Sequence, residues 1–259
     1  MNRKIFFGTN LKMYKDIQET SEYLSALSNL TKDINRDEIE IFVIPSFTTL
    51  NSCKNAIGHQ NIVLGAQNMA WEEEGQYTGE VSPKMLKEVG VKLVMIGHSE
   101  RRQIFKETDE QEGKKVRKAL ESGFSTLLCI GETLEQKNYG VSGEVLAIQL
   151  KTALNNLDAT RLEQLRIAYE PIWSIGVNGI PAAPEYAGEM AGIIREVLKD
   201  LFGEAGNDIP ILYGGSVNPD NAEILIKQKN IDGLFVGRSA WQAEKFDKLI
   251  RASIKAVRD

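Results

Sequence analysis

Three side chains of this protein are suited to proton transfer or to binding an anion, and each follows a short apolar run. Glu170 comes directly after Ala168-Tyr169. A carboxylate at the end of a buried strand is costly unless it reacts or is paired, so the alternative to a role as a base is a salt bridge with Lys12 or an arginine. Lys12, close to Asn10, is expected to hold an anionic substrate and to stabilise a developing oxyanion, although most lysines are simply surface charges.

His98, the third of these residues, lies between an apolar run and a segment that is expected to begin a helix. The N-terminus of a helix is electropositive, which disfavours an imidazolium and favours a neutral ring that donates a hydrogen bond. The alternative is a purely structural histidine. Ser99 and Glu100 follow and are expected to support the site, with Glu100 paired to a cation. The only other histidine, His59, lies in a polar segment and receives no role.

Two glycine-containing turns follow the last two apolar runs and indicate a phosphate site. Gly214-Gly215-Ser216 and Gly237 can present backbone N–H groups to an anion without interference from a Cβ atom. A helix beginning after the second turn would add a favourable dipole. Either turn alone is more simply explained as a tight turn, but two of them at adjacent strand ends favour phosphate binding.

Eight short apolar runs recur along the chain. Runs with few polar positions are typical of strands buried on both faces of a parallel sheet. They cover Ile5–Asn10, Ile39–Ile44, Ile62–Ala66, Lys92–Gly97, Thr126–Ile130, Arg166–Tyr169, Ile209–Tyr213 and Gly233–Val236. Segments of helical period lie between them, most clearly from Met190 to Leu201, and Pro184 suits the first turn of that helix. The alternation predicts the α/β class.

Eight strand–helix units in 259 residues predict a single closed (β/α)8 barrel, with one domain over residues 1–259. The alternative is a doubly wound open sheet, which usually has fewer strands and a glycine-rich first turn, a feature that Thr9-Asn10-Leu11-Lys12 lacks. The active site of a barrel lies at the C-terminal ends of its strands, where the polar residues above fall. The segment 174–181 is interpreted as a mobile lid that excludes water.

The composition of the chain limits the kinds of partner, location and cofactor that can be expected. The net charge of −5 and the lack of a basic run with aromatics argue against nucleic acid. No stretch approaches the roughly 20 apolar residues of a membrane helix, and the run Ile5-Phe6-Phe7 is too short for a signal peptide. Two cysteines without a CxxC pattern favour a reducing, cytoplasmic location. No metal-ligand spacing occurs, so neither a metal nor another cofactor is expected.

Motifs along nearly the whole chain resemble those of the triosephosphate isomerase family. The matching pieces are Asn10-Leu11-Lys12-Met13, Gly65-Ala66-Gln67-Asn68, Tyr77-Thr78-Gly79-Glu80, Ile96 through Arg102, Cys129-Ile130-Gly131-Glu132, Tyr169 through Gly176, Tyr213 through Val217, and Val236-Gly237. Each motif alone is weak to moderate evidence for this family. All of them together, in this order along the chain, are specific evidence for it. The resemblance implies a (β/α)8 barrel that isomerises a small phosphorylated sugar through an enediol, without a cofactor.

The resemblance also implies individual roles. Glu170 looks like the general base and His98 like the neutral electrophile, a pairing that is a standard example of this family's chemistry. Lys12 and Asn10 look like the substrate-positioning pair. The residues that resemble phosphate ligands are Gly176, Ser216 and Gly237. The family is typically dimeric, and the loop around Thr78 looks like the one that reaches the partner's active site.

The chain departs from the usual family pattern at informative places. Leu11 replaces a common tryptophan, Tyr14 replaces an asparagine, the lid reads differently over 177–181, and Arg238 replaces a glycine of the phosphate turn. Arg238 is expected to add a bidentate contact to phosphate; alternatively it points away and strains the backbone. The residues favour triosephosphate isomerase activity, with the same chemistry on a four-carbon ketose phosphate as the alternative and a non-catalytic phosphate-binding barrel as a third hypothesis.

Overall fold

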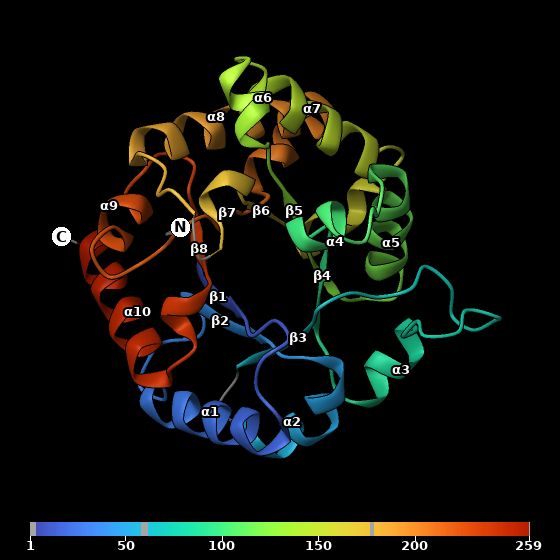
Figure 1. The fold of residues 1–259 in the computed structure, drawn as a ribbon, viewed down its shortest axis with the longest axis vertical. Helices are drawn as coiled ribbons and strands as arrows, with labels where there is room; N and C mark the ends of the chain where they lie inside the picture. Colours follow the sequence, from blue (N-terminus) through green and yellow to red (C-terminus); the bar gives the residue numbers. More distant parts are fainter. Residues whose placement is uncertain (1–3, 58–61, 177–178, 259) are drawn as a thin grey trace.

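The computed structural model describes residues 4–57, 62–176 and 179–258. Eight parallel strands form a closed barrel in the order β1 to β8, with β8 pairing back to β1 (Figure 1). The strands are β1 (Ile5–Asn10), β2 (Ile39–Ile44), β3 (Val63–Ala66), β4 (Leu93–Ile96), β5 (Ser125–Ile130), β6 (Leu165–Tyr169), β7 (Ile211–Tyr213) and β8 (Gly233–Val236). The predicted (β/α)8 barrel is confirmed, and the open sheet is excluded because β1 and β8 share a ladder.

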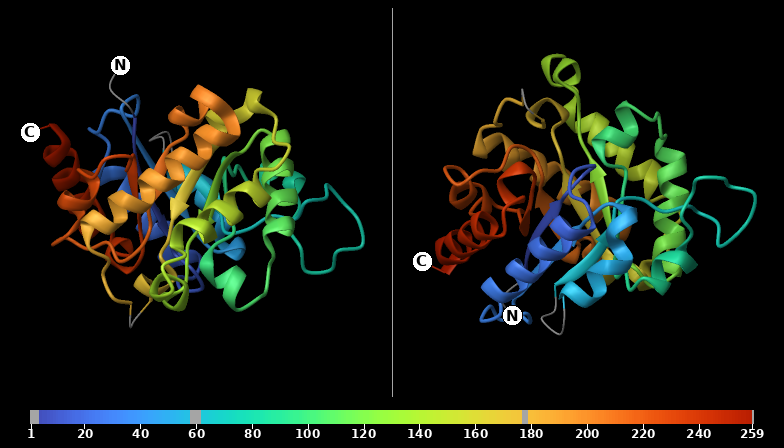
Figure 2. Two further views of the ribbon diagram at one scale, coloured as in Figure 1. Left: turned by 90° about the horizontal axis from the view of Figure 1, so that it is seen from above. Right: turned by 60° about the horizontal axis from the view of Figure 1, so that its bottom comes forward.

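Helices surround the barrel on all sides (Figure 2). The α-helices of the described residues are α1 (Ile17–Leu30), α2 (Leu50–Ile57), α3 (Pro83–Glu88), α4 (Ser99–Gln103), α5 (Asp109–Glu121), α6 (Leu134–Asn138), α7 (Ser142–Ala153), α8 (Pro184–Phe202), α9 (Ala222–Ile226) and α10 (Ala243–Arg258). The helix predicted after Pro184 is α8, which has this proline in its first turn and buries Met190, Ile194 and Leu198. None of the described helices is long and apolar enough to cross a membrane.

The strand ends differ slightly from the prediction, for local reasons. β7 begins at Ile211 rather than Ile209, because Pro210 has no N–H to donate to a ladder; its carbonyl still accepts from Ile167 N at 2.9 Å. β4 ends before Gly97, whose φ of +77° is outside the range of a strand.

The barrel interior is a packed core rather than a pore. Phe6, Phe42, Met95, Leu127 and Phe235 are among its buried residues. A Cβ atom at position 8 would lie 1.9 Å from the Phe42 ring, so glycine there makes room for this side chain. The filled interior leaves the ends of the barrel as the places where a ligand can bind.

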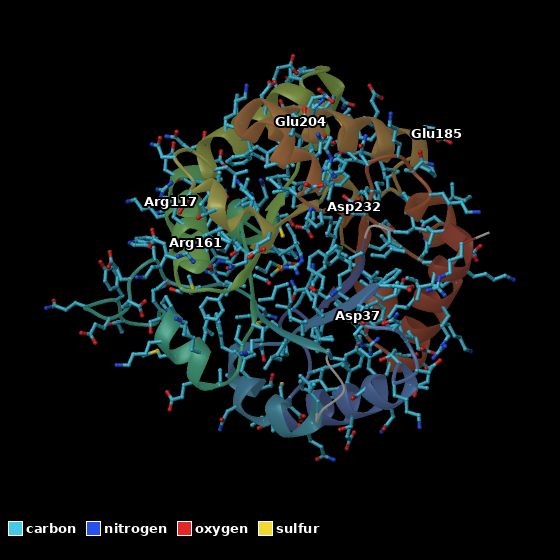
Figure 3. The ribbon with its side chains drawn as sticks, turned by 180° about the vertical axis from the view of Figure 1, so that it is seen from behind. Asp37, Arg117, Arg161, Glu185, Glu204 and Asp232 are labelled. Carbon is cyan, nitrogen blue, oxygen red and sulfur yellow. The ribbon has the colours of Figure 1, made fainter. Side chains whose placement is uncertain are left out.

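The two ends of the barrel differ in character. Figure 3 shows the end where strands begin, with Asp37, Arg161 and Asp232 near the starts of β2, β6 and β8. Arg195 donates to Asp232 at 2.8 Å, and this buried ion pair belongs to the scaffold. The other end faces the viewer in Figure 1 and carries the loops from which the candidate residues come.

Candidate active site

A cavity of about 280 Å³ lies where the strands end. Its walls come from the segments after β1, β4, β6, β7 and β8, which bring together residues far apart in the sequence. Eight of the ten candidate residues line it: Asn10, Lys12, His98, Glu170, Gly176, Ser216, Gly237 and Arg238. The two supporting candidates do not: Ser99 is buried as the first residue of α4, and Glu100 lies behind Lys12.

Glu170 is buried at the end of β6, with an exposed fraction of 3%. Its Oε1 atom lies 3.6 Å from Nε2 of His98, and its Oε2 atom accepts no hydrogen bond from the described part of the chain. The alternative of a salt bridge with Lys12 or an arginine is not what the described residues show, because Lys12 pairs with Glu100 instead. A buried carboxylate with a free oxygen at a cavity wall can accept a proton from a bound ligand.

The backbone around Glu170 is shaped to hold this side chain. A Cβ at Gly214 would lie 2.9 Å from Glu170 Cγ, and one at Gly131 would lie 1.9 Å from the Glu170 carbonyl oxygen. Behind the carboxylate, Cys129 is fully buried; burial and then the neighbouring Glu170 charge raise the pKa of its thiol well above its usual range. The glycines therefore let the backbone pack closely around Glu170, and the neutral thiol of Cys129 lies beside its carboxylate.

His98 caps the N-terminus of α4 and is almost fully buried. Its Nδ1 atom accepts a hydrogen bond from the Glu100 backbone N–H at 3.2 Å. A ring nitrogen that accepts has no proton, so the proton of a neutral imidazole is on Nε2. Because Nε2 is the atom beside Glu170 at the cavity wall, the ring can donate a hydrogen bond to a ligand there.

Lys12 stands in a tight turn after β1. Its backbone N–H donates to Asn10 Oδ1 at 2.8 Å, and its carbonyl accepts from Gln67 Nε2 at 2.7 Å. Its ammonium group donates to Glu100 Oε1 at 2.7 Å, which confirms that Glu100 pairs with a cation. Glu100 is partly exposed, so the pair orients the ammonium toward the cavity without fully neutralising a bound anion.

The glycine turns follow the neighbouring strands β7 and β8 and border the same cavity. The Ser216 backbone N–H donates to Ser174 Oγ at 3.0 Å, and Ser174 is itself buried after β6. Gly176 has a φ of +92°, and a Cβ at Gly237 would meet open space. Backbone amides at such turns can bind an anion. Val177 and Asn178 of the proposed lid, like His59, lie outside the described residues.

The segment after β8 differs from the expectation of a helix directly after the turn. Gly237 is followed by a single 3-10 turn, Arg238–Ala240, and α10 begins only at Ala243. Arg238 is exposed and lines the cavity, and it has no positive φ, so the backbone strain considered as an alternative is absent. It forms no ion pair with any residue that the structure describes. Its guanidinium is therefore available to an anionic ligand.

Arg102, at the end of α4, ties the wall of the site to the scaffold. It donates to the Gly97 carbonyl at 2.8 Å and to the Cys129 carbonyl at 3.0 Å, and it pairs with Asp109 and Glu112. Burial raises the pKa of Glu112 to about 8. The ends of β4 and β5 are thus held together beneath His98 and Glu170.

A buried carboxylate, Glu132, anchors the start of the proposed lid. It accepts from Trp173 Nε1 at 2.8 Å and from the hydroxyl groups of Tyr169 and Tyr186 at about 3 Å. Burial, and then the charge of Glu132, raises the pKa of Tyr169 above its usual range, so this hydroxyl stays a donor. These bonds fix the point at which the segment after β6 leaves the barrel.

Sequence reasoning missed Ser174 and Trp241 as cavity residues. A serine in a glycine-rich segment gives no sign of the backbone amide that it meets from another strand. The signal for Trp241 was available, since a tryptophan four residues after a glycine at a strand end is a large side chain near the predicted site.

Known proteins match this sequence over nearly the whole chain. A family model described as triosephosphate isomerase matches residues 5–253. An L-erythrulose-1-phosphate isomerase of Rhizobium etli is 46% identical over 96% of this chain and 92% of its own. One from Mesorhizobium japonicum is 44% identical over 95% and 96%. A triosephosphate isomerase of Carboxydothermus hydrogenoformans is 43% identical over 97% of this chain and all of its own.

The extent of these matches and the closed barrel agree with each other. The family model covers the first strand through most of the last helix, and relatives with identities above 40% are covered almost completely. The chain therefore belongs to the triosephosphate isomerase family, and it is an isomerase.

Proposed function

We propose that Glu170 is the base that moves a proton between two adjacent carbons of a phosphorylated sugar. The observation that carries this proposal is the 3.6 Å between Glu170 Oε1 and His98 Nε2, both buried at one cavity wall. A base and a hydrogen-bond donor so close together can act on a carbon and on the oxygen of the carbonyl group beside it. Lys12, which borders the same cavity, stabilises the negative charge that develops on that oxygen.

The reaction is balanced within the substrate. Glu170 removes the proton from the hydroxyl-bearing carbon beside the carbonyl, and the C–H electron pair forms the double bond of an enediolate. His98 Nε2–H donates to the oxygen that gains charge. Glu170 then returns its proton to the former carbonyl carbon. His98 gives its Nε2 proton to the former carbonyl oxygen and takes the hydroxyl proton of the first carbon, whose oxygen becomes the new carbonyl. No electron leaves the substrate, so the chemistry requires no redox cofactor.

The phosphate group would be held at the part of the cavity formed after β6, β7 and β8, here called the phosphate wall. The amides near Gly176, Ser216 and Gly237 and the guanidinium of Arg238 all border the cavity there. Amides and a guanidinium suit a phosphate dianion, the guanidinium by two parallel hydrogen bonds. This wall serves any ketose 1-phosphate, because the arm from carbonyl to phosphate is the same whatever lies at the other end.

We propose L-erythrulose 1-phosphate as the preferred substrate. Relatives of that name from Rhizobium etli and Mesorhizobium japonicum share 46% and 44% of their residues with this chain. The departures at Leu11 and Tyr14 from the usual pattern of triosephosphate isomerases support the same choice. Dihydroxyacetone phosphate is the second candidate, because the catalytic groups are intact and the Carboxydothermus relative is a triosephosphate isomerase.

The two substrates differ by one hydroxymethyl group on the carbon that loses its proton. We expect kcat/KM for L-erythrulose 1-phosphate to exceed that for dihydroxyacetone phosphate by about tenfold or more, since one group that fills a matching pocket is worth roughly 1–3 kcal/mol. Purified enzyme assayed with each substrate in turn measures the ratio. A ratio below one identifies the triose as substrate, and no turnover of either would leave the phosphate-binding barrel as the function.

We also propose that the enzyme is a homodimer joined through the loop around Thr78. Residues 72–80 are all exposed, and this loop extends from the barrel between β3 and α3 (Figure 1). Met13, Ile104 and Phe105, from the segments after β1 and β4, are more than 60% exposed. Exposed apolar residues around a projecting loop are typical of an interface with a second copy.

The dimer predicts a molar mass of twice the 28.9 kDa of one chain in sedimentation equilibrium at micromolar concentration. Replacing Phe105 and Ile104 with lysine should shift the equilibrium to the monomer, since two buried like charges would meet at the interface. A wild-type mass of one chain would contradict the proposal. The matched control is the same substitution at Ile148, which is 61% exposed on α7.

A cytoplasmic location is proposed as well. Cys53 and Cys129 are both buried as free thiols, the state that a reducing compartment maintains.

A further inference from the structure

Trp241 is a cavity residue for which the proton transfer described above has no use. It follows the 3-10 turn after β8 and is partly buried against the main core. One side of it lines the cavity of the active site. Its other side borders a second pocket with Leu11 and Tyr14, two positions at which the chain departs from the usual family pattern.

The indole of Trp241 replaces a missing backbone donor. The ladder between β1 and β8 ends at the pair of Thr9 and Val236, because the chain turns away at Gly237. The carbonyl of Asn10, the next residue of β1, lies beyond the last pair of this ladder. Trp241 Nε1 donates to this carbonyl at 2.9 Å. A buried carbonyl left without a donor would cost roughly 1–3 kcal/mol.

Two further contacts join the turn after β8 to the first strand and helix. The Tyr23 hydroxyl, from α1, donates to the Ala240 carbonyl at 2.7 Å. The Tyr14 ring packs against the Trp241 ring with a centroid distance of 4.6 Å. The turn that holds Arg238 and the turn that holds Lys12 are therefore connected by side chains, not only by their strands.

The turn that depends on this connection is a strained one. Lys12 has a φ of +54°, which costs a residue other than glycine roughly 1–2 kcal/mol. Such a conformation persists only where the surroundings fix it. Three hydrogen bonds fix this turn. Asn10 Oδ1 accepts from the Lys12 N–H, Gln67, after β3, donates to the Lys12 carbonyl, and Trp241, after β8, donates to the Asn10 carbonyl.

We propose that Trp241 is a positioning residue that sets the distance between the Lys12 ammonium and the phosphate wall. The indole N–H holds the Asn10 carbonyl and thereby places the Lys12 ammonium. A single substrate molecule can then bind Lys12 through its carbonyl group and Arg238 through its phosphate group. Both candidate substrates share this arm. The proposal therefore rests on the isomerase activity and on the proposed role of Lys12, and it does not depend on which substrate is preferred.

Trp241→Phe tests the proposal, because it keeps an aromatic ring at this position and removes the N–H together with part of the ring area. Loss of one hydrogen bond of about 1 kcal/mol predicts a five- to tenfold lower kcat/KM with the better of the two substrates. A merely structural role would instead lower the unfolding temperature and leave kcat/KM within twofold. That result would overturn the proposal.

A double-mutant cycle separates action through Lys12 from a general loosening of the cavity. The probe is 2-phosphoglycolate, a phosphate ester whose carboxylate resembles the charge of an enediolate, and its Kd is measured by calorimetry. We expect Trp241→Phe to weaken binding about fivefold in the otherwise unchanged enzyme and less than twofold when Lys12 is already methionine, because coupled residues are not additive. Equal losses in both backgrounds would overturn the proposal even if the enzyme proves inactive on both sugars.

Discussion

Replacing Glu170 with aspartate is expected to lower kcat at least a hundredfold while KM changes by less than about fivefold. The shorter side chain withdraws the carboxylate by roughly 1 Å, and a misplacement of that size is worth about a factor of 10² in rate. The backbone around Glu170 has little room to shift and restore the position, because Gly214 and Gly131 pack so close to this residue that a Cβ at either would clash with it. Steady-state kinetics of the purified variant measure both constants.

The separation of kcat from KM is what makes this test specific. An interaction that acts only in the transition state changes kcat, whereas a lost ground-state contact changes KM. The matched control is Glu223→Asp, the same substitution at an exposed position on α9, which should change neither constant. A kcat within fivefold of the wild-type value would remove Glu170 from the role of base.

Replacing Arg238 with glycine, the residue usual in the family, should raise KM about 10- to 100-fold for either substrate. Hydrogen bonds to charged groups contribute roughly 1.5–3 kcal/mol, and the guanidinium at this wall has no carboxylate partner among the described residues. Because triose and tetrulose phosphates share the phosphate arm, the ratio of their kcat/KM values should stay within about threefold. The same assays with both substrates test this.

Arg238→Lys is the matched control, since it keeps the charge and removes the planar fork. An intermediate KM is expected if two parallel hydrogen bonds form to phosphate. An unchanged KM in Arg238→Gly would mean that the guanidinium does not bind substrate. A changed substrate ratio would instead assign Arg238 to selection of chain length, a role at the reacting end of the sugar.

The positions of the strands could be predicted from the sequence, because each strand is buried on both faces and is therefore an apolar run. Ile39–Ile44 and Gly233–Val236 are apolar runs whose ends agree with the observed strands. The runs alone could not close the barrel. Closure depends on the register between β1 and β8, in which Phe6 lies opposite Gly233, and no local pattern encodes a pairing across more than two hundred residues.

The cavity was predictable to the extent that its residues stand at strand ends. Asn10 ends β1, while His98 and Glu170 stand two and one positions after β4 and β6, and all three reach the cavity that their positions predicted. Ser99 and Glu100 also follow a strand, but the helix that begins there turns one into the core and the other behind Lys12. Position after a strand places a residue on the correct face, and the next turn of backbone decides where its side chain lies.

The amino-acid sequence by itself determined the class of fold, the face that carries the site, and the side chains able to transfer a proton or bind an anion. Only the tertiary structure decided that Lys12 pairs with Glu100 and leaves Glu170 free, and that Trp241 bonds to the strand that carries Asn10. The physical reason is the distance along the chain over which each kind of interaction acts. Apolar periodicity and turn chemistry act over a few residues, whereas these contacts join segments brought together only when the barrel closes.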